Sequence, residues 1–331
     1  MPPPDIGEHG RDARAVVLSV VIVTWNCRAL VLDCLAALFA SELPAQTEVI
    51  VVDNASADGT AAAVAVAFPE VLLIANHENA GFAAGNNLGF AVARGQTILL
   101  LNPDAFPAAP DSLMALWRFL EANAGYAAAG PRLLHEDGRH QVGDAGWRPG
   151  FISLALHALG LSQLLPRHLH GVFLVRPDRL GAGPVPVDWI CGACMMVRAD
   201  AVRQVGGLDA NFFMYAEDVE WGCRMRRAGL RLGYLPQVRV RHLQGGTQVG
   251  RAAPTRWLDN LVRLHCSLNG PGALPLLRPI LAAGFALRAL AYGALAFLRG
   301  DRGRATQAAT MWAFARHAWG LRPGGGAASP S

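Results

Sequence analysis

Four short apolar segments alternate with helical patterns in the first hundred residues, and this alternation limits the folds open to the chain. Strands that are apolar along their whole length, rather than at every second residue, are typical of a parallel sheet covered by helices on both faces. The sequence therefore predicts an α/β fold with a mostly parallel central sheet and right-handed crossovers. The predicted strands are residues 16–24, 48–53, 71–75 and 97–101, and the predicted helices are residues 28–40, 58–68 and 82–94.

Each of these strands ends in a polar loop, and the loop after the fourth strand is the most informative. There, Asn102-Pro103-Asp104 follows the fully apolar residues 98–101. Ligands of open α/β sheets bind just outside the carboxyl ends of the strands. A carboxylate at that place, with a carboxamide two residues before it, suits a divalent metal that holds a diphosphate. The first loop lacks the GxGxxG pattern of dinucleotide-binding folds, which argues against NAD or FAD.

A second acidic cluster opens a predicted helix over residues 219–228. It contains Glu217, Asp218 and Glu220. A metal-assisted group transfer needs at least one acidic residue that binds the metal and another that acts as the base. Capping of the helix explains Asp218 equally well, because a carboxylate at this end also meets the helix dipole favourably. The two roles are compatible.

The rest of the chain has a different pattern of predicted strands and helices. Residues 131–150 are polar and Gly-rich and predict a hairpin or excursion, whereas residues 254 onward predict helices. The remaining predicted strands are residues 126–129, 185–190, 193–197 and 231–242, the last as one or two strands that end at His242, and the remaining predicted helices are residues 151–165 and 199–205.

The composition limits the partners that the protein can bind and the cellular compartment in which it can fold. All 29 basic residues of the 331 are Arg and the net charge is +4, but no basic stripe with interleaved aromatic residues occurs, so we expect no nucleic-acid partner. Cys191 and Cys194 have CxxC spacing without a second pair to complete a zinc site. We therefore interpret them as small buried thiols in a reducing compartment.

The ordered set of loop motifs resembles glycosyltransferase family 2, the inverting enzymes of the GT-A fold, and within it the bacterial rhamnosyltransferase-like branch. The resemblance covers roughly residues 16–250, ends near His242, and implies a GT-A sheet with a C-terminal helical extension. The matching segments are residues 20–27, 52–60, 79–89, 100–105 and 206–221.

The resemblance also implies site residues. Asp218 would be the general base, and Asp104 with His242 would bind a divalent metal, Mg²⁺ or Mn²⁺. Trp189, Gly192 and Glu217 are the candidates for contact with the acceptor. Asn102 replaces the first Asp of the family's DXD motif, which leaves Asp104 as the main ligand. The implied contacts with the nucleotide-sugar donor are Thr24, Asn26, Asp53, Asn79, Gly81, Asn86 and Asn102.

The domain organisation expected from these observations has four parts. The GT-A domain would cover residues 15–250, with a nucleotide-sugar half over 15–130 and an acceptor half over 131–250. We expect residues 1–14 and 323–331 to be disordered, and residues 251–322 to form a helical region that is a candidate for membrane association.

Residues 279–298 form an apolar segment that is about long enough, at ~20 residues, to cross a bilayer. Arg288 lies in its middle and further arginines flank it, so an interfacial helix fits better than a span. A helix packed on the catalytic domain is the alternative. Residues 15–24 resemble a signal peptide but lack a cleavage site, so we expect them to be the first strand of a cytoplasmic protein that contacts the inner face of the membrane.

The resulting hypothesis is a metal-dependent inverting transfer of a sugar, with rhamnose as a candidate, from a nucleoside-diphosphate sugar to a cell-envelope polysaccharide or lipid-linked acceptor. The replacement of the first DXD acid by Asn102 leaves open a non-catalytic sugar- or lipid-binding protein on a degenerate GT-A scaffold. A nucleotidyltransferase is a weaker alternative, because the chain has no Lys for the usual Gly-rich signature.

Overall fold

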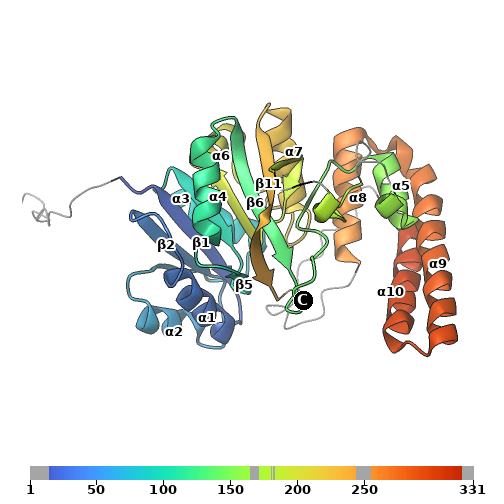
Figure 1. The fold of residues 1–331 in the computed structure, drawn as a ribbon, viewed down its shortest axis with the longest axis horizontal. Helices are drawn as coiled ribbons and strands as arrows, with labels where there is room; N and C mark the ends of the chain where they lie inside the picture. Colours follow the sequence, from blue (N-terminus) through green and yellow to red (C-terminus); the bar gives the residue numbers. More distant parts are fainter. Residues whose placement is uncertain (1–14, 165–170, 180, 182, 244–254, 323–331) are drawn as a thin grey trace, which may run out of the picture.

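The computed structural model describes residues 15–164, 171–179, 181, 183–243 and 255–322 (Figure 1). The expectations for residues 1–14 and 323–331, and the expected boundary at residue 250, lie outside the described residues.

The strands of the described residues follow the apolar segments closely. The fourth predicted strand has the predicted bounds, and the predicted strand over 126–129 continues for five more residues. The strands are β1 Leu18–Thr24, β2 Thr47–Asp53, β3 Leu72–Ala75, β4 Thr97–Leu101, β5 Ala105–Pro107, β6 Tyr126–Leu134, β7 Ala145–Gly146, β8 Val185–Val187, β9 Trp189–Ile190, β10 Cys194–Arg198 and β11 Arg231–His242.

The helices also lie near their predicted places, with one helix, α4, that the sequence analysis missed. The α-helices are α1 Arg28–Phe39, α2 Thr60–Ala67, α3 Gly81–Val92, α4 Ser112–Ala122, α5 Phe151–Ala158, α6 Ala199–Val205, α7 Glu217–Arg227, α8 Arg256–Asn269, α9 Leu274–Arg299 and α10 Arg302–Trp319, and the short 3₁₀ turns are η1 Leu161–Leu164, η2 Pro177–Arg179 and η3 Pro271–Ala273.

The central sheet has the strand order β3-β2-β1-β4-β10-β6-β11-β5, and β8 pairs with β11. The first four strands in this order are mutually parallel, as predicted. Strand β10 is antiparallel to both of its neighbours, β4 and β6, whereas β6 and β11 are again parallel. The sheet is therefore mixed at its centre, and β10 joins a donor-side half to a second half that ends at β5.

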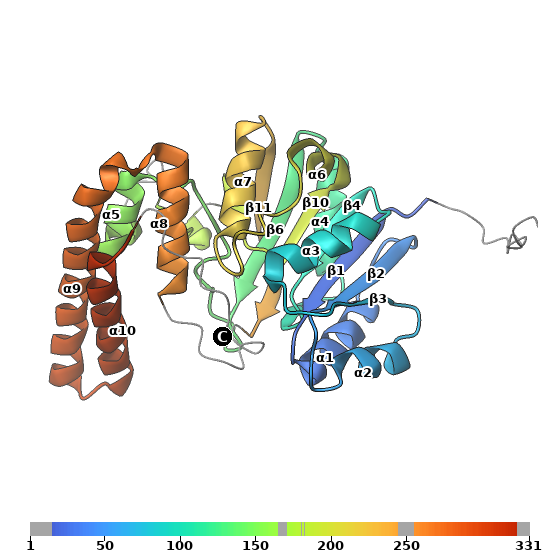
Figure 2. The same ribbon diagram turned by 180° about the vertical axis from the view of Figure 1, so that it is seen from behind.

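Alternate residues of the central strands point to opposite faces of the sheet and enter two separate cores. On β1, Val20 and Ile22 pack with α1, α2 and α4, whereas Val21 packs with α3, α6 and α7. Both faces are therefore covered by helices, as Figures 1 and 2 show. This explains why the strands are apolar without alternation.

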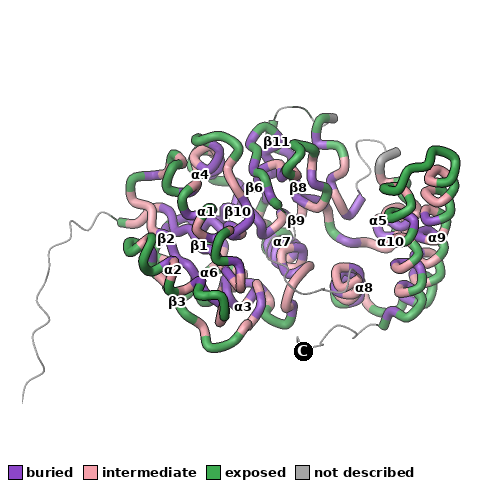
Figure 3. The backbone as a smooth tube through the Cα atoms, turned by 90° about the horizontal axis from the view of Figure 1, so that it is seen from below, coloured by how far each residue is buried: buried purple, intermediate pink, exposed green. Residues whose placement is uncertain are grey.

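The C-terminal helices form a third core of their own. Helices α5, α8, α9 and α10 bury apolar side chains together with Val219 and Cys223 of α7. Helices α9 and α10 form an antiparallel hairpin beside the sheet domain, and α8 lies between this hairpin and α7 (Figures 1 and 2). Exposed positions run along the hairpin in Figure 3.

Candidate active site

The ends of β1 and β2 bring together three of the predicted donor residues. Thr24 lies opposite Asp53 in the parallel register of the two strands, and both side chains are buried. The Asp53 carboxylate accepts hydrogen bonds from the backbone N–H of Ser56, at 3.1 Å, and from the Ser56 hydroxyl. Asn26 has a positive φ of 46°, and its Oδ1 accepts from the N–H of Ala57 at 2.7 Å. This edge is thus a fixed polar surface.

The loop before α3 is locked by Gly81, whose φ is +84°. A Cβ at this position would lie 2.6 Å from the carbonyl oxygen of Phe213, so only glycine fits. Asn79 Oδ1 accepts from the Gly81 N–H at 3.1 Å, and Asn54 donates to the Gly81 carbonyl at 3.0 Å. Asn86 is 1% exposed and donates to the Phe82 carbonyl at 2.9 Å, so it also stabilises the helix itself.

The predicted metal residues meet across the sheet. Antiparallel pairing of β5 with β11 sets His242 opposite Ala105, directly beside Asp104. His242 Nε2 lies 3.3 Å from Asp104 Oδ1 and 3.3 Å from Asn102 Nδ2. Asp104 is 1% exposed, and its Oδ1 accepts no hydrogen bond of good geometry. The structure thus brings Asp104 and His242, the predicted metal ligands, together with Asn102, and the metal-binding role stays a prediction.

Gln141 orients the His242 ring, and the sequence analysis did not single it out. Its Oε1 lies 2.9 Å from His242 Nδ1. A carboxamide oxygen only accepts, so Nδ1 carries the ring proton, and in the neutral ring Nε2 presents a lone pair. Two electron-rich atoms, Nε2 and Asp104 Oδ1, then face each other in a buried place, where a cation would satisfy both. A ring nitrogen held in this way through its second nitrogen is typical of metal ligands.

These residues fit a divalent ion only in part. No group of three or more His, Cys, Asp or Glu side chains arranged for a metal occurs in the part of the chain that the structure describes. Asp104 and His242 would therefore supply two ligands, and donor phosphate oxygens and water are the natural completion. A cavity of about 650 Å³ opens beside them; it is lined by His135, Glu136, Asp137, Arg139, His242 and Leu243.

Asp218 lies at the start of α7 with both carboxylate oxygens hydrogen-bonded. Oδ2 accepts from the Gly192 N–H at 3.1 Å, and Oδ1 accepts from the Val219 N–H at 2.8 Å. Burial raises the pKa of the Asp218 carboxyl above its ordinary value, although the hydrogen bonds from Gly192, Val219 and the Cys191 thiol act in the opposite direction. A carboxylate held in place with a raised pKa has the properties of a general base.

Glu217 precedes Asp218 and lies in a drier place. It is 5% exposed, and its Oε2 is buried without a hydrogen-bond partner. Burial raises the pKa of Glu217 well above its usual value, and the neighbouring charge of Asp218 raises it further. Burial therefore favours the protonated form of Glu217 beside the candidate base.

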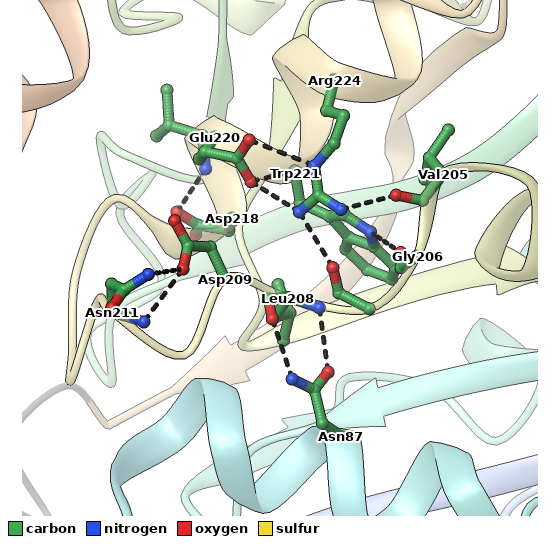
Figure 4. A network of polar contacts seen from close by, with 12 residues as sticks. Asn87, Val205, Gly206, Leu208, Asp209, Asn211, Asp218, Glu220, Trp221 and Arg224 are labelled. Carbon is green, nitrogen blue, oxygen red and sulfur yellow. Dashed lines mark hydrogen bonds and ion pairs between the residues drawn. The ribbon is translucent and has the colours of Figure 1, made fainter. Parts of the chain in front are cut away.

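The rest of α7 fixes the loop that precedes it (Figure 4). Arg224 pairs with Glu220, at 2.6 Å, and donates to the carbonyl oxygens of Val205 and Gly207. Asn87 on α3 exchanges two hydrogen bonds with the backbone of Leu208, at 2.8 and 2.9 Å. Helices α3 and α7, from the two halves of the domain, therefore hold the same turn.

The predicted acceptor residues have different surroundings. Gly192 donates its N–H to Asp218, the candidate base, and a Cβ at Gly192 would lie 2.8 Å from the Phe82 ring. Trp189 is 2% exposed, packs in the third core and donates its indole N–H to the Val172 carbonyl at 3.1 Å. This gives Trp189 a packing role in place of the predicted stacking on a sugar, because a stacked ring needs an open face.

The Cys191 and Cys194 thiols are free; Cys194 is buried, as expected, whereas Cys191 is half-buried. Burial raises the pKa of Cys194 to about 12. Both are therefore thiols rather than thiolates at neutral pH, which leaves them poor metal ligands and poor nucleophiles.

Comparison with known proteins agrees with this geometry. Residues 19–206 match the family model for glycosyl transferase family 2, and residues 169–319 match that for glycosyl transferase family group 2. The chain is 34% identical over 238 residues to N-acetylglucosaminyl-diphospho-decaprenol L-rhamnosyltransferase of Mycobacterium tuberculosis, an alignment that covers 68% of this chain and 76% of that protein.

Two more distant proteins extend the likeness. The chain is 26% identical over 231 residues to the low-salt glycan biosynthesis hexosyltransferase Agl10 of Haloferax volcanii, over 69% of this chain and 67% of that protein. Among solved structures, the mannosyltransferase PcManGT from Pyrobaculum calidifontis, in complex with GDP-Man and Mn²⁺, superposes with a TM-score of 0.57 at 20% identity. That match covers 94% of this chain and 90% of the other, and it supports a GT-A fold.

Proposed function

The chain belongs to glycosyl transferase family 2 and is a glycosyltransferase, and on that basis we propose that it transfers rhamnose from a nucleoside-diphosphate rhamnose to a lipid-linked diphosphate acceptor. The observation that carries this proposal is the 34% identity to a protein named as an L-rhamnosyltransferase of a decaprenol-diphosphate sugar. The expectation from sequence of a family 2 enzyme is confirmed, so the alternative of a nucleotidyltransferase falls away.

In this proposal the donor lies along the ends of β1, β2 and β4. Asp53 and Asn26 would hold the nucleoside, since both are fixed by hydrogen bonds within the 53–57 loop. Gly81 lets the loop before α3 approach closely, and backbone N–H groups at a helix N-terminus favour phosphate oxygens.

Asp104 and His242, with Asn102 beside them, would hold a divalent metal at the donor diphosphate. A divalent ion bound there neutralises the negative charge that develops on the leaving nucleoside diphosphate. The support is the Asp104 Oδ1 atom, which is buried without a hydrogen-bond partner and lies 3.3 Å from His242 Nε2. The titles of two GT-A neighbours also name Mn²⁺.

Asp218 would take the proton of the acceptor hydroxyl as that oxygen attacks the anomeric carbon. Attack from the side opposite the diphosphate inverts the anomeric centre. The Gly192 and Val219 N–H groups keep the carboxylate in one orientation, which is what proton transfer in a defined geometry requires.

The C-terminal hairpin would contact the inner face of the membrane, where a lipid-linked acceptor resides. Among the described residues, Pro271–Arg299 is the one helical stretch that is long and apolar enough to cross a membrane. Only 28% of its most apolar 18 residues are buried in the protein, so most of this apolar segment is free to contact lipid. Phe297 is 89% exposed and Leu298 is 76% exposed. We propose that they enter the interface while nearby arginines meet anionic head groups.

The test is a transfer assay with purified full-length protein, a polyprenyl-diphosphate-linked N-acetylglucosamine in detergent, Mn²⁺ or Mg²⁺, and a panel of nucleoside-diphosphate sugars. We expect the acceptor to gain the mass of one deoxyhexose only with rhamnose donors. Transfer of a hexose in place of rhamnose would overturn the proposed donor, and NMR of the product would report the anomeric configuration.

A further inference from the structure

We propose that Asn260, on helix α8, is a positioning residue for the base Asp218; the inference rests on the proposed function. Asn260 is 4% exposed, and its Nδ2 donates hydrogen bonds to two successive carbonyl oxygens, those of Met214 and Tyr215, both at 2.9 Å. One buried amide group therefore holds two peptide units of the segment that leads into α7.

This segment has an unfavourable backbone conformation. Tyr215 and Ala216 both have φ of +71°, a region that residues with a Cβ rarely adopt. They directly precede Glu217 and Asp218, the first residues of α7. Two such residues in succession persist only when surrounding contacts determine the conformation. The two hydrogen bonds of Asn260 are contacts of this kind, since they reach the carbonyl groups on either side of the Tyr215 N–H and Cα.

Helix α8 makes two further contacts with this segment from the same face. The guanidinium of Arg263 lies 5.0 Å from the centre of the Phe212 ring, and that of Arg256 lies 5.8 Å from the Phe213 ring. Positions 256, 260 and 263 are separated by four and three residues, so they line one side of the helix. The segment is therefore held along its length by α8.

The opposite side of the segment is held by the donor half of the protein. The Phe213 carbonyl accepts from the Phe82 N–H at 3.0 Å, and the Phe82 ring packs on Gly192, whose N–H binds Asp218. Asp218 is thus placed directly by Gly192 and indirectly by Asn260 through the strained turn. A displacement of about 1 Å at a reacting group can cost roughly 10²-fold in rate.

Helices α7 and α8 both lie beyond the residues 19–206 that match the family 2 model, and within the residues 169–319 that match the family group 2 model. A helix of the C-terminal region, which packs in the same core as the α9–α10 hairpin, therefore completes the geometry of the catalytic base.

The first experiment compares Asn260→Ala with Asn269→Ala. Asn269 is the same residue type on the same helix, but it donates to the Pro149 carbonyl at 3.1 Å, away from the turn. We expect Asn260→Ala to lower kcat by roughly 10- to 10²-fold with the donor KM unchanged. Asn269→Ala should leave kcat within about twofold. Equal loss of kcat in both variants, at equal loss of Tm, would indicate general destabilisation and overturn the assignment.

A double variant separates positioning from other effects on rate. If Asn260 acts through Asp218, then Asp218→Asn combined with Asn260→Ala should turn over about as slowly as Asp218→Asn alone. Once residue 218 cannot take a proton, its exact position no longer affects the rate. Losses that multiply would show that Asn260 acts independently of the base, and the proposal would be wrong.

Hydrogen–deuterium exchange provides a readout that needs no substrate. In Asn260→Ala, the amides of residues 213–219 should exchange faster, whereas those of β1 and β2 should keep the wild-type rate. Unchanged exchange over residues 213–219 would overturn the positioning role of Asn260, even if the transfer assay confirmed the proposed function. If the wild-type protein transferred no sugar in that assay, the result would overturn the proposed function and leave the exchange result unaffected. If the Asn260→Ala protein does not fold, Asn260→Asp takes its place in all three experiments. This substitution keeps the volume of the side chain, and the ionised carboxylate cannot donate the two hydrogen bonds.

Discussion

His242 Nε2 lies 3.3 Å from Asp104 Oδ1, although Asp104 directly precedes β5 and His242 is the last residue of β11. Pairing of β5 with β11 creates this proximity, and Gln141 directs the lone pair of the imidazole toward the carboxylate. Burial of two acceptors at this distance is unfavourable without a positive partner. A cation bound between Asp104 Oδ1 and His242 Nε2 would offset this cost, in keeping with the proposed metal site.

Asp104→Asn should abolish metal-dependent binding of nucleoside diphosphate. The substitution keeps the shape of the side chain but removes the charge that attracts the ion, so we expect transfer to fall by at least ~10²-fold. Calorimetric titration of a nucleoside diphosphate with and without Mn²⁺ measures the effect. Asp111→Asn, in front of α4 and without a side-chain capping bond, is the matched control. Wild-type Mn²⁺ dependence in Asp104→Asn would refute the assignment.

Asp218→Asn should lower turnover by roughly 10²–10⁴-fold, the usual contribution of a general base. The Asn amide has one acceptor oxygen, so it keeps one of the two hydrogen bonds from the Gly192 and Val219 N–H groups and loses the other, which should lower Tm slightly and leave the donor KM nearly unchanged. Steady-state kinetics and thermal unfolding check this together. A loss of Tm large enough to account for the lost activity would favour a structural role in capping α7.

Asp53→Ala should raise the donor KM and leave kcat nearly unchanged, because the nucleoside lies far from the bond that breaks. Binding of that kind contributes equally to the ground state and the transition state. The variant also frees Ser56, so the 53–57 loop should lose order. Ser56→Ala separates the two contributions: it removes the hydroxyl contacts with Asp53 and with the Asn26 N–H, and it keeps the carboxylate and the backbone hydrogen bond to it. An effect of Asp53→Ala on kcat alone would contradict this placement.

Glu217 should make the protein less stable as pH rises. Its pKa is raised by burial, so between its ordinary pKa of about 4.3 and its higher native value the native state holds a proton that the unfolded state has lost. The stability that this proton supports is complete below the ordinary pKa and is lost as pH rises through the native pKa, by about 1.4 kcal/mol per unit of difference.

Glu217→Gln mimics the protonated acid and should remove this part of the pH dependence. We expect its Tm to exceed that of the wild type at pH 8 and to approach it near pH 4.5. Glu121→Gln, on an exposed position of α4, should keep the wild-type slope. Parallel curves for the wild type and Glu217→Gln would show that Glu217 is ionised in the native protein.

The residues that sequence analysis could find are those whose signal is local. Asp53 and Asp104 follow apolar strands, and parallel strands deliver their carboxyl ends to one edge, so strand recognition alone places them. Gln141 and Asn260 carry no such signal, because each acts on a residue that tertiary folding brings to it. Trp189 shows the opposite error: an aromatic residue near a predicted site was given a contact, whereas the third core covers it.

The missed elements have similar causes. Strand β5 has three residues and exists because it pairs with the end of β11. The amphipathic pattern of α4, with Leu113, Leu116 and Leu120 buried at helical spacing, was present in the sequence and could have been recognised. The antiparallel direction of β10 is seen in its pairing with β4 and β6, and the local residue pattern of a strand carries no information on direction.

The final prediction concerns the membrane. Phe297 and Leu298 are exposed near the tip of the α9–α10 hairpin, next to Arg299, Arg302 and Arg304. Each arginine near an anionic surface contributes about 1 kcal/mol, and insertion of a Phe or Leu side chain contributes about 1.5–3 kcal/mol. Full-length protein should therefore float with phosphatidylglycerol vesicles at low salt and should partly dissociate at high salt, which a spanning helix would not do.

The variant Phe297→Ser/Leu298→Ser should weaken flotation by at least ~10-fold, because it removes apolar area that would enter the interface. Val66→Ser is the control, since Val66 is 84% exposed on α2, far from the hairpin. Both variants change only exposed side chains, so their Tm should match that of the wild type. If wild-type protein stays in solution with anionic vesicles at low salt, or if the double variant floats as well as Val66→Ser, the hairpin is not a membrane contact. In that case, the exposed apolar positions of α9 would need another partner.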